Sequence, residues 1–283
     1  MSTQTALHIF DTKRNDRAGL AGTILKLYDG SLDAVVVRQA FPVDVLESVA
    51  SRLQRSDAAE PWERPNSVVP SEDIWVLGTD TPATPTCKAP RGASLDAYLD
   101  GASKHVEASR VFPSTFDVAA ETARLLSELA DGRPVTVPAS GNGRGYTPYT
   151  LRLLKEGKQI SVHHDYHYKL DLYRELSPLL DTTTLISFFV TLQRPDSGGA
   201  LIVYALNSDD PAQPRLANGR SDLAAIEAGY ENERFELYPG DFILLTSGRR
   251  FHRVEPIVGA TPRITLGGFL ALDRNHERVL FWS

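Results

Sequence analysis

The sequence predicts an α+β protein, with helices in the first half of the chain and short antiparallel strands in the second. Two segments of the first half, one after Asp44 and one after Pro113, carry apolar residues at helical spacing. From residue 150 onward the pattern changes to short β-branched and apolar runs, of which residues 185–192 are the strongest, separated by turn sequences. This order of elements is typical of a β-sandwich or barrel supported by helices.

The composition favours one large domain and excludes several classes of partner. The chain has 283 residues, 42% of them hydrophobic, and a net charge of −6. A chain of this length buries about 75% of the surface that its unfolded form exposes. Nothing in the charge pattern suggests a nucleic-acid or anionic membrane partner. Cys87 is the single cysteine, which excludes a disulfide framework, and no apolar run approaches the ~18 residues of a membrane span. We therefore expect a cytoplasmic protein with a single domain over residues 1–283.

Within this domain, we expect residues 1–133 to be mainly a helical support and lid region. The second of the two helices begins near Ser114, a possible N-cap, and ends at Gly132. Between the helices, residues 58–93 contain many prolines, and so long an irregular segment is often a lid or a binding loop.

Residues 134–283 form the predicted sheet core. The strands are expected at residues 150–154, 159–165, 185–192, 200–204, 235–238, 242–245, 251–258 and 263–272. A short helix that opens at Ser221-Asp222 and closes at Gly229 interrupts them.

A candidate metal site lies in the second of these strands. His163 and Asp165 are two residues apart, and in an extended strand such residues leave the backbone on the same face. An imidazole nitrogen and a carboxylate oxygen on one face can bind one metal ion from one side. A second histidine from another strand would complete a two-histidine, one-carboxylate facial triad, which leaves coordination positions open. The spacing alone is weak evidence, because chance produces a His-x-Asp in such a composition about half the time.

His252 is the candidate third ligand, and Arg263 is a candidate anion-binding residue. By strand alternation His252 shares a face with Val254. Arg263 opens the last long strand between apolar stretches, where an unpaired guanidinium would be unfavourable. A buried dicarboxylate would pair with it through two parallel hydrogen bonds, and the hydroxyl of Thr265, on the same face, would add another. The alternative is that both histidines are hydrogen-bonded core residues and that Arg263 forms a structural ion pair.

Taken together, His163-x-Asp165, Pro239-Gly240-Asp241, His252-x-Val254-x-Pro256 and Arg263-x-Thr265 resemble the iron(II)- and 2-oxoglutarate-dependent oxygenases. The segment Ser197-Gly198-Gly199-Ala200-Leu201 is similar to the Gly-Gly-x-Leu segment of the prolyl-hydroxylase-like branch, and the resemblance covers roughly residues 145–272. We find no match to the tyrosine that helps to hold 2-oxoglutarate in the prolyl hydroxylases, which leaves that second contact unassigned.

The resemblance implies a double-stranded β-helix (jelly-roll) core braced by the N-terminal helices. It also implies that His163, Asp165 and His252 hold Fe(II), that Arg263 binds the far carboxylate of 2-oxoglutarate, and that O2 is the other co-substrate. The expected reaction is hydroxylation of an unactivated C–H bond with release of succinate and CO2. Halogenases of this superfamily have Gly or Ala in place of the carboxylate, and Asp165 therefore favours hydroxylation, although desaturation or ring closure would use the same ligands.

Two other interpretations stay open. A cupin-type metal-dependent dioxygenase would use O2 without 2-oxoglutarate and would give Arg263 no role, and a non-catalytic jelly-roll binding protein would have no tight iron site. The proline-rich segment and the insertions suit a small enclosed substrate of the tailoring type, such as an amino-acid derivative or a natural-product intermediate. His167, on the ligand face if the strand continues, is a further candidate near the metal. The oligomeric state does not follow from the sequence.

Overall fold

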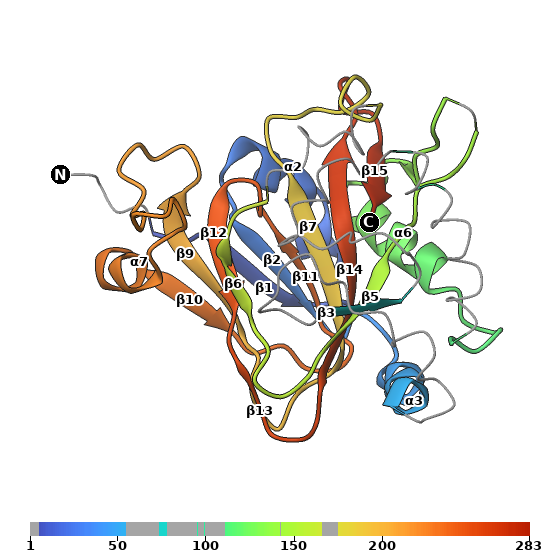
Figure 1. Cartoon of the computed structure of the whole chain (residues 1–283). Coiled ribbons are helices and arrows are strands. Elements are labelled where there is room, and N and C mark those ends of the chain that lie inside the picture. Colours follow the sequence, from blue (N-terminus) through green and yellow to red (C-terminus); the bar gives the residue numbers. More distant parts are fainter. Residues whose placement is uncertain are drawn as a thin grey trace.

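Two β-sheets that face each other form the body of the molecule (Figure 1). The structure is a computed structural model that describes residues 6–54, 74–77, 95, 99, 111–141, 143–165 and 175–283. The larger sheet has nine strands in the order β1-β2-β11-β7-β14-β15-β4, while β5 pairs with β14 and β3 pairs with β5. These strands are β1 Ile9–Lys13, β2 Ala34–Arg38, β3 Ile74–Leu77, β4 Val135–Thr136, β5 Thr150–Leu154, β7 Ile186–Gln193, β11 Phe242–Leu245, β14 Arg263–Leu272 and β15 Val279–Trp282.

The smaller sheet has four strands in the order β10-β9-β12-β6. They are β6 Ile160–His163, β9 Leu201–Asn207, β10 Asn232–Phe235 and β12 Arg250–Val254. The chain passes back and forth between the two sheets. It runs from β5 in the larger sheet to β6 in the smaller, then to β7 in the larger, to β9 and β10 in the smaller, to β11 in the larger, to β12 in the smaller and to β14 in the larger. All neighbours within this set of eight strands pair in antiparallel fashion. This winding is the one that the predicted jelly roll requires.

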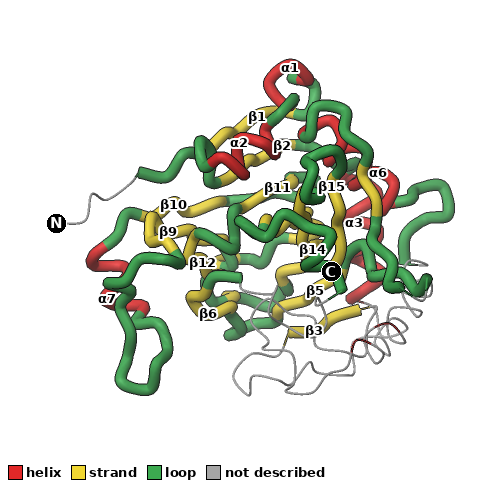
Figure 2. The backbone as a smooth tube through the Cα atoms, turned by 90° about the horizontal axis from the view of Figure 1, so that it is seen from above, coloured by secondary structure: helices red, strands yellow, loops and turns green. Residues whose placement is uncertain are grey.

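Helices cover the outer faces of both sheets (Figure 2). Helices α3 (Val43–Gln54) and α6 (Val118–Leu129), with the short α1 (Arg17–Leu20) and α2 (Thr23–Asp29), lie on the side of the larger sheet. Their buried apolar side chains form one core with the outward residues of that sheet, including Leu46, Leu125, Val190, Leu244 and Leu266. Helix α7 (Leu223–Gly229) packs through Ile226 on the outer face of the smaller sheet. Among the described residues, none of the helices has the length and apolar character needed to span a bilayer.

The expected helices and core strands are present, with local corrections. The first 133 residues also contribute strands: the β-branched run at residues 33–38 predicts β2, which pairs with β11, and β1, which was not expected, pairs with β2 in parallel. The N-cap of α6 is Asp117 rather than Ser114, since the Asp117 carboxylate accepts hydrogen bonds from the amides of Ala119 and Ala120. Strand β10 comes earlier than the predicted 235–238, and the predicted strand 251–258 is divided into β12 and β13 (Ile257–Val258). Most of residues 58–93 lies outside the described residues.

Two glycine turns hold the ends of the core strands close together. Gly198, in β8 (Ser197–Gly198), has a φ of +68°, and a Cβ atom there would lie 2.0 Å from the carbonyl oxygen of Pro256. Gly240 has a φ of +89°, and a Cβ atom there would lie 2.7 Å from the carbonyl oxygen of Phe41. Both conformations and both close approaches require glycine, which gives a physical reason for the Gly-Gly and Pro-Gly-Asp segments.

Candidate metal centre

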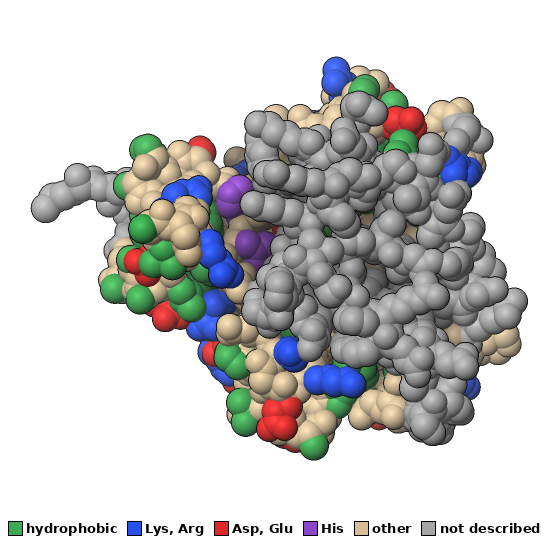
Figure 3. All heavy atoms as spheres, viewed as in Figure 1, with side chains coloured by type: hydrophobic (Ala, Val, Ile, Leu, Met, Phe, Trp, Pro, Cys, Tyr) green, Lys and Arg blue, Asp and Glu red, His purple; other side chains and the backbone are tan. Residues whose placement is uncertain are grey.

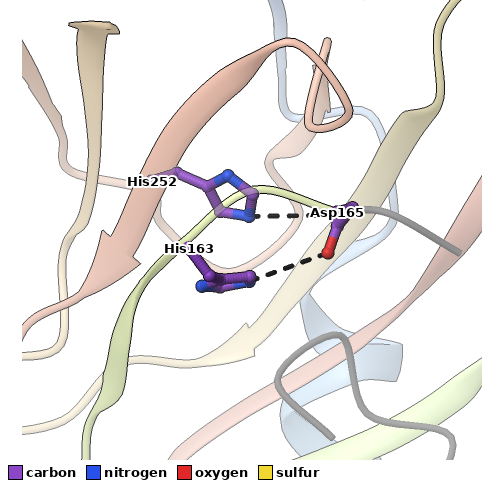
Figure 4. A group of neighbouring side chains, drawn as sticks. All are labelled: His163, Asp165 and His252. Atoms are coloured by element: carbon purple, nitrogen blue, oxygen red, sulfur yellow. Dashed lines mark ion pairs between the residues drawn. The ribbon is translucent and has the colours of Figure 1, made fainter. Parts of the chain in front are cut away.

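Three side chains meet where β6 ends beside β12 (Figure 4). His163 is the last residue of β6, Asp165 follows two residues later, and His252 lies directly opposite His163 in the antiparallel pair. The Nε2 atom of His163 lies 3.7 Å from Oδ1 of Asp165, and Nε2 of His252 lies 3.9 Å from Oδ2. One ligand atom from each residue lies within 4.8 Å of the other two, so the three residues could hold one metal ion.

A β-bulge directs the two histidines into the space between the sheets. Val254 pairs with Ile160 and His252 pairs with His163, so that the step of two residues in β12 faces a step of three in β6. Ile160 and Val254 belong to the apolar core between the sheets, whereas Val162 packs on the outer face with Phe251. The extra residue lets His163 face the same interior as Ile160 despite their odd spacing. Bulges of this kind commonly redirect side chains beside active sites.

The backbone fixes the orientation of both imidazole rings. The Nδ1 atom of His163 lies 2.7 Å from the carbonyl oxygen of Ser161, and Nδ1 of His252 lies 3.0 Å from that of Arg250. Because a carbonyl oxygen only accepts, each Nδ1 carries a proton, and Nε2, on the side of Asp165, is the nitrogen that each ring can offer to a metal ion. Among the described residues, the buried Nε2 of His163 has no hydrogen-bond partner. A metal ion bound by both Nε2 atoms fits this arrangement.

Burial keeps His252 neutral and therefore able to bind a metal. The side chain is 7% exposed, and burial, with a contribution from neighbouring His163, lowers the pKa of His252 to about 4. The imidazole rings of His163 and His252 lie with their centroids 4.3 Å apart, so a positive charge on both rings at once would be unfavourable. The carboxylate of Asp165 is fully buried and provides the negative charge of the group.

The inward face of β14 carries the second predicted group. Ile264 and Leu266 pack outward against the helices, which turns Arg263 and Thr265 toward the interior. Arg263 is 6% exposed, its guanidinium carbon lies 5.3 Å from the centroid of the Phe189 ring, and no described carboxylate lies within ion-pair distance of it. Burial, with the nearby charge of Arg152, lowers the pKa of Arg263 to about 10. The alternative of a structural ion pair at Arg263 therefore finds no support among the described residues.

The structure brings the predicted ligands together and leaves one candidate outside the described part of the chain. His163, Asp165 and His252 form one group, and Arg263 and Thr265 share one face as period-two alternation predicts. Histidine side chains are visible at the surface on the side of the smaller sheet (Figure 3), and His163 has a side-chain exposure of 17%. His164 points to the opposite face, with its ring centroid 4.9 Å from that of Phe251. His167 lies outside the described residues.

The sequence as a whole matches a known family. Residues 12–283 match the model of the carrier-protein-independent halogenase WelO5. The chain belongs to this WelO5 halogenase family. No functionally curated protein matches the sequence. The family is described as a halogenase family, whereas this chain has a carboxylate, Asp165, among the three residues that could hold a metal ion.

Solved structures support the fold. An N-substituted L-amino acid dioxygenase from Burkholderia ambifaria, in complex with α-ketoglutarate, is 15% identical with a TM-score of 0.52, covering 91% of this chain and 89% of that chain. A prolyl-4-hydroxylase from Pseudomonas putida is 16% identical with a TM-score of 0.41, covering 87% of this chain and 95% of that chain. The predicted resemblance to the iron(II)- and 2-oxoglutarate-dependent oxygenases is thus confirmed at the level of the fold.

The sequence did not predict the position of Arg152 in the interior or the ion pair of Asp33 with Arg250. Arg152 lies opposite Thr265 in the pairing of β5 with β14, on the same inward face as Leu154. Alternation within the predicted strand 150–154 could have placed it there. Asp33 forms a buried ion pair with Arg250, and the separation of 217 positions between them leaves no local signal.

Proposed function

We propose that the protein is an Fe(II)- and 2-oxoglutarate-dependent dioxygenase that hydroxylates an unactivated C–H bond of a small molecule and releases succinate and CO2. The observation that carries the proposal is the convergence of His163, Asp165 and His252. Two neutral imidazoles with free Nε2 atoms and one carboxylate match the facial triad of non-haem iron oxygenases. When bound, iron(II) and 2-oxoglutarate would activate O2, which is the oxidant that the protein's own side chains do not supply.

Each residue of the site has a defined task in this proposal. His163 and His252 offer Nε2, because their Nδ1 protons are held by backbone carbonyl groups. Asp165 balances part of the charge of the ion. Arg263 binds the far carboxylate of 2-oxoglutarate, and the hydroxyl of Thr265, 3% exposed on the same face, donates a further hydrogen bond. The apolar residues around them exclude water from the reacting groups.

Asp165 supports hydroxylation over halogenation within the family. A halogenase needs a coordination position for the halide, and the sequence resemblance associates that position with Gly or Ala. In this chain a carboxylate occupies it, with its oxygens 3.7 and 3.9 Å from the two Nε2 atoms. Halogenation is the second candidate, because the chain belongs to a halogenase family. With substrate, O2 and excess chloride, we expect a product heavier by one oxygen atom, and a chlorinated product would support the second candidate.

Anaerobic addition of Fe(II) and 2-oxoglutarate tests the cofactors without a substrate. We expect the weak visible charge-transfer band of the iron chelate, and Asp165→Ala and His252→Ala should each reduce it. The absence of any band from the unmodified protein would contradict the proposal. A cupin-type enzyme would bind iron without the band, and a non-catalytic binding protein would bind no iron tightly.

The substrate class is inferred from a protein of similar fold. The Burkholderia ambifaria dioxygenase of similar fold acts, by its name, on N-substituted L-amino acids. We therefore propose an amino-acid derivative or a natural-product intermediate as the substrate. Screening such compounds for substrate-dependent succinate release tests this choice. Activity on a polypeptide alone would contradict it.

A further inference from the structure

A buried ion pair lies directly behind the proposed metal ligands. Asp33 precedes β2, Arg250 begins β12, and the two side chains are 1% and 5% exposed. The Nε and Nη2 atoms of Arg250 lie 2.7 and 3.1 Å from the two oxygens of Asp33. The remaining Nη1 donates to the carbonyl oxygen of Ala205 at 3.1 Å, and the amide of His8 donates to Asp33 at 3.0 Å. Both charges are therefore fully bonded, in the bidentate geometry that holds a guanidinium most firmly.

This pair fixes the residue that orients His252. The carbonyl oxygen of Arg250 accepts the Nδ1 proton of His252 at 3.0 Å. Between these two residues the pairing of β12 with β9 shifts in register, because the step from Arg250 to His252 faces the step from Asn207 to Val203. The backbone of Arg250 pairs with Asn207, and its amide donates to the carbonyl oxygen of Thr246 at 2.9 Å. The side chain of Arg250, anchored on Asp33 and Ala205, adds a second hold on this irregular part of the strand.

Asp33 is also connected to Asp165, through its backbone carbonyl group and the loop before β12. The carbonyl oxygen of Asp33 accepts hydrogen bonds from the amide and the hydroxyl of Thr246, at 3.0 and 3.1 Å. The carbonyl oxygen of the next residue, Ser247, accepts the amide proton of Asp165 at 2.8 Å. Two of the three proposed ligands are thus connected to Asp33 by short chains of hydrogen bonds.

We propose that Asp33 and Arg250 are positioning residues that hold His252 and Asp165 ready to bind the metal. The inference rests on the proposed function for the identity of the metal, but the positioning itself can be measured with any divalent ion. Residues that orient metal ligands commonly change metal affinity by about 10- to 100-fold when they are replaced. A purely structural ion pair would change stability and leave metal affinity unaltered.

The chain contains a matched control at the opposite end of β2, where Arg38 bonds to Asp241. Asp241 precedes β11, is 2% exposed, and accepts from Arg38 at 2.7 Å and from the amides of Gln39 and Tyr238 at 3.0 Å each. Like Asp33, it is a buried carboxylate bonded to one arginine and to backbone amides. Unlike Asp33, it has no described hydrogen bond to a proposed metal ligand or to a residue that contacts one.

The experiment compares Asp33→Asn with Asp241→Asn in the full chain. Co(II) is titrated anaerobically, with its visible d–d absorption as the readout, and thermal unfolding of the metal-free protein is measured in parallel. We expect at least tenfold weaker Co(II) binding for Asp33→Asn and less than a twofold change for Asp241→Asn, at similar losses of thermal stability. In the metal-free protein, NMR of 15N-labelled histidine should show that His252 loses its single Nδ1–H tautomer only in Asp33→Asn.

Equal Co(II) affinity in the two variants, or an unchanged His252 tautomer in Asp33→Asn, would overturn the proposal. If Asp33→Asn does not fold, Arg250→Lys takes its place, because lysine keeps the charge and loses the bidentate geometry. Unchanged Co(II) affinity in the Arg250→Lys variant would likewise overturn it. An unmodified protein that binds Co(II) but gives no band with Fe(II) and 2-oxoglutarate would contradict the proposed function and leave the positioning test valid.

Discussion

The two faces of the larger sheet differ sharply although the same strands supply both. On β14, Ile264 and Leu266 point outward into the apolar core under the helices, and Arg263 and Thr265 point inward. On β5, Leu151 and Leu153 point outward, and Arg152 points inward beside Thr265. The outer face gains free energy from close packing. The inner face buries the guanidinium of Arg263, which is unfavourable unless an anion joins it. The contrast supports the proposal that one face of the sheet stabilises the fold and the other takes part in ligand binding.

Removing a proposed metal ligand should have the largest effect on function. We expect His252→Ala to lower turnover by more than about a hundredfold, because loss of a ligand exceeds the effect of losing a residue that orients one. Arg253→Gln is the control on the same strand, since Arg253 faces outward and bonds to Tyr204 and Glu227. Steady-state succinate release and iron content check both variants. Equal losses in the two would contradict the assignment of the inner face.

Replacing Arg263 should separate binding from stability. We expect Arg263→Met to weaken 2-oxoglutarate binding by about 2–5 kcal/mol, since it removes one partner of a buried charge pair. The ligand-free protein should unfold at a higher temperature, because the variant no longer buries a guanidinium that has no described carboxylate partner. Isothermal titration with Fe(II)-loaded protein and thermal unfolding of the metal-free protein measure the two effects. Unchanged 2-oxoglutarate affinity would exclude Arg263 from the co-substrate site.

A substitution on the outer face should lower stability and leave the affinity for 2-oxoglutarate unchanged. Leu266 is fully buried, and we expect Leu266→Ala to lower the free energy of unfolding by about 2–5 kcal/mol through the lost contacts and the cavity. The affinity for 2-oxoglutarate should stay within about twofold, because the residue faces away from the site. Denaturant unfolding and titration of the folded variant test this. A large change in affinity would show that the two faces are not independent.

Lowering the pH should destabilise the metal-free protein through protonation of His252 on the inner face. The folded pKa of His252, about 4, lies below the ordinary value of 6.5 because of burial, so the unfolded chain takes up the proton first as pH falls. The stability that neutral His252 contributes is therefore complete above pH 6.5 and is lost between about pH 6.5 and 4, on the order of 3 kcal/mol in all. Thermal unfolding against pH for the unmodified protein and His252→Gln measures it. The variant should show a flatter pH profile over this range.

Much of this contrast could be predicted from the sequence, because strand alternation is a local property. Side chains two residues apart in a strand share a face, which predicts that Arg263 lies on one face with Thr265 and that His252 lies on one face with Val254. The structure confirms both predictions. The bulge in β6 could not be predicted, since it depends on how β12 pairs with a strand about ninety residues away. The same holds for the contact of Asp33 with Arg250, which joins residues 217 positions apart. Long-range pairing, rather than residue type, limits such predictions.

The anchoring of Arg250 on Asp33 has a consequence for the order in which the molecule assembles. The two residues are 217 positions apart, so the contact cannot form until nearly the whole chain has been synthesised and β2 has paired with β11. Contacts of such long range are slow to form in folding. With the proposed positioning role, the metal ligands would reach their binding geometry only after residues at both ends of the chain have joined the same barrel.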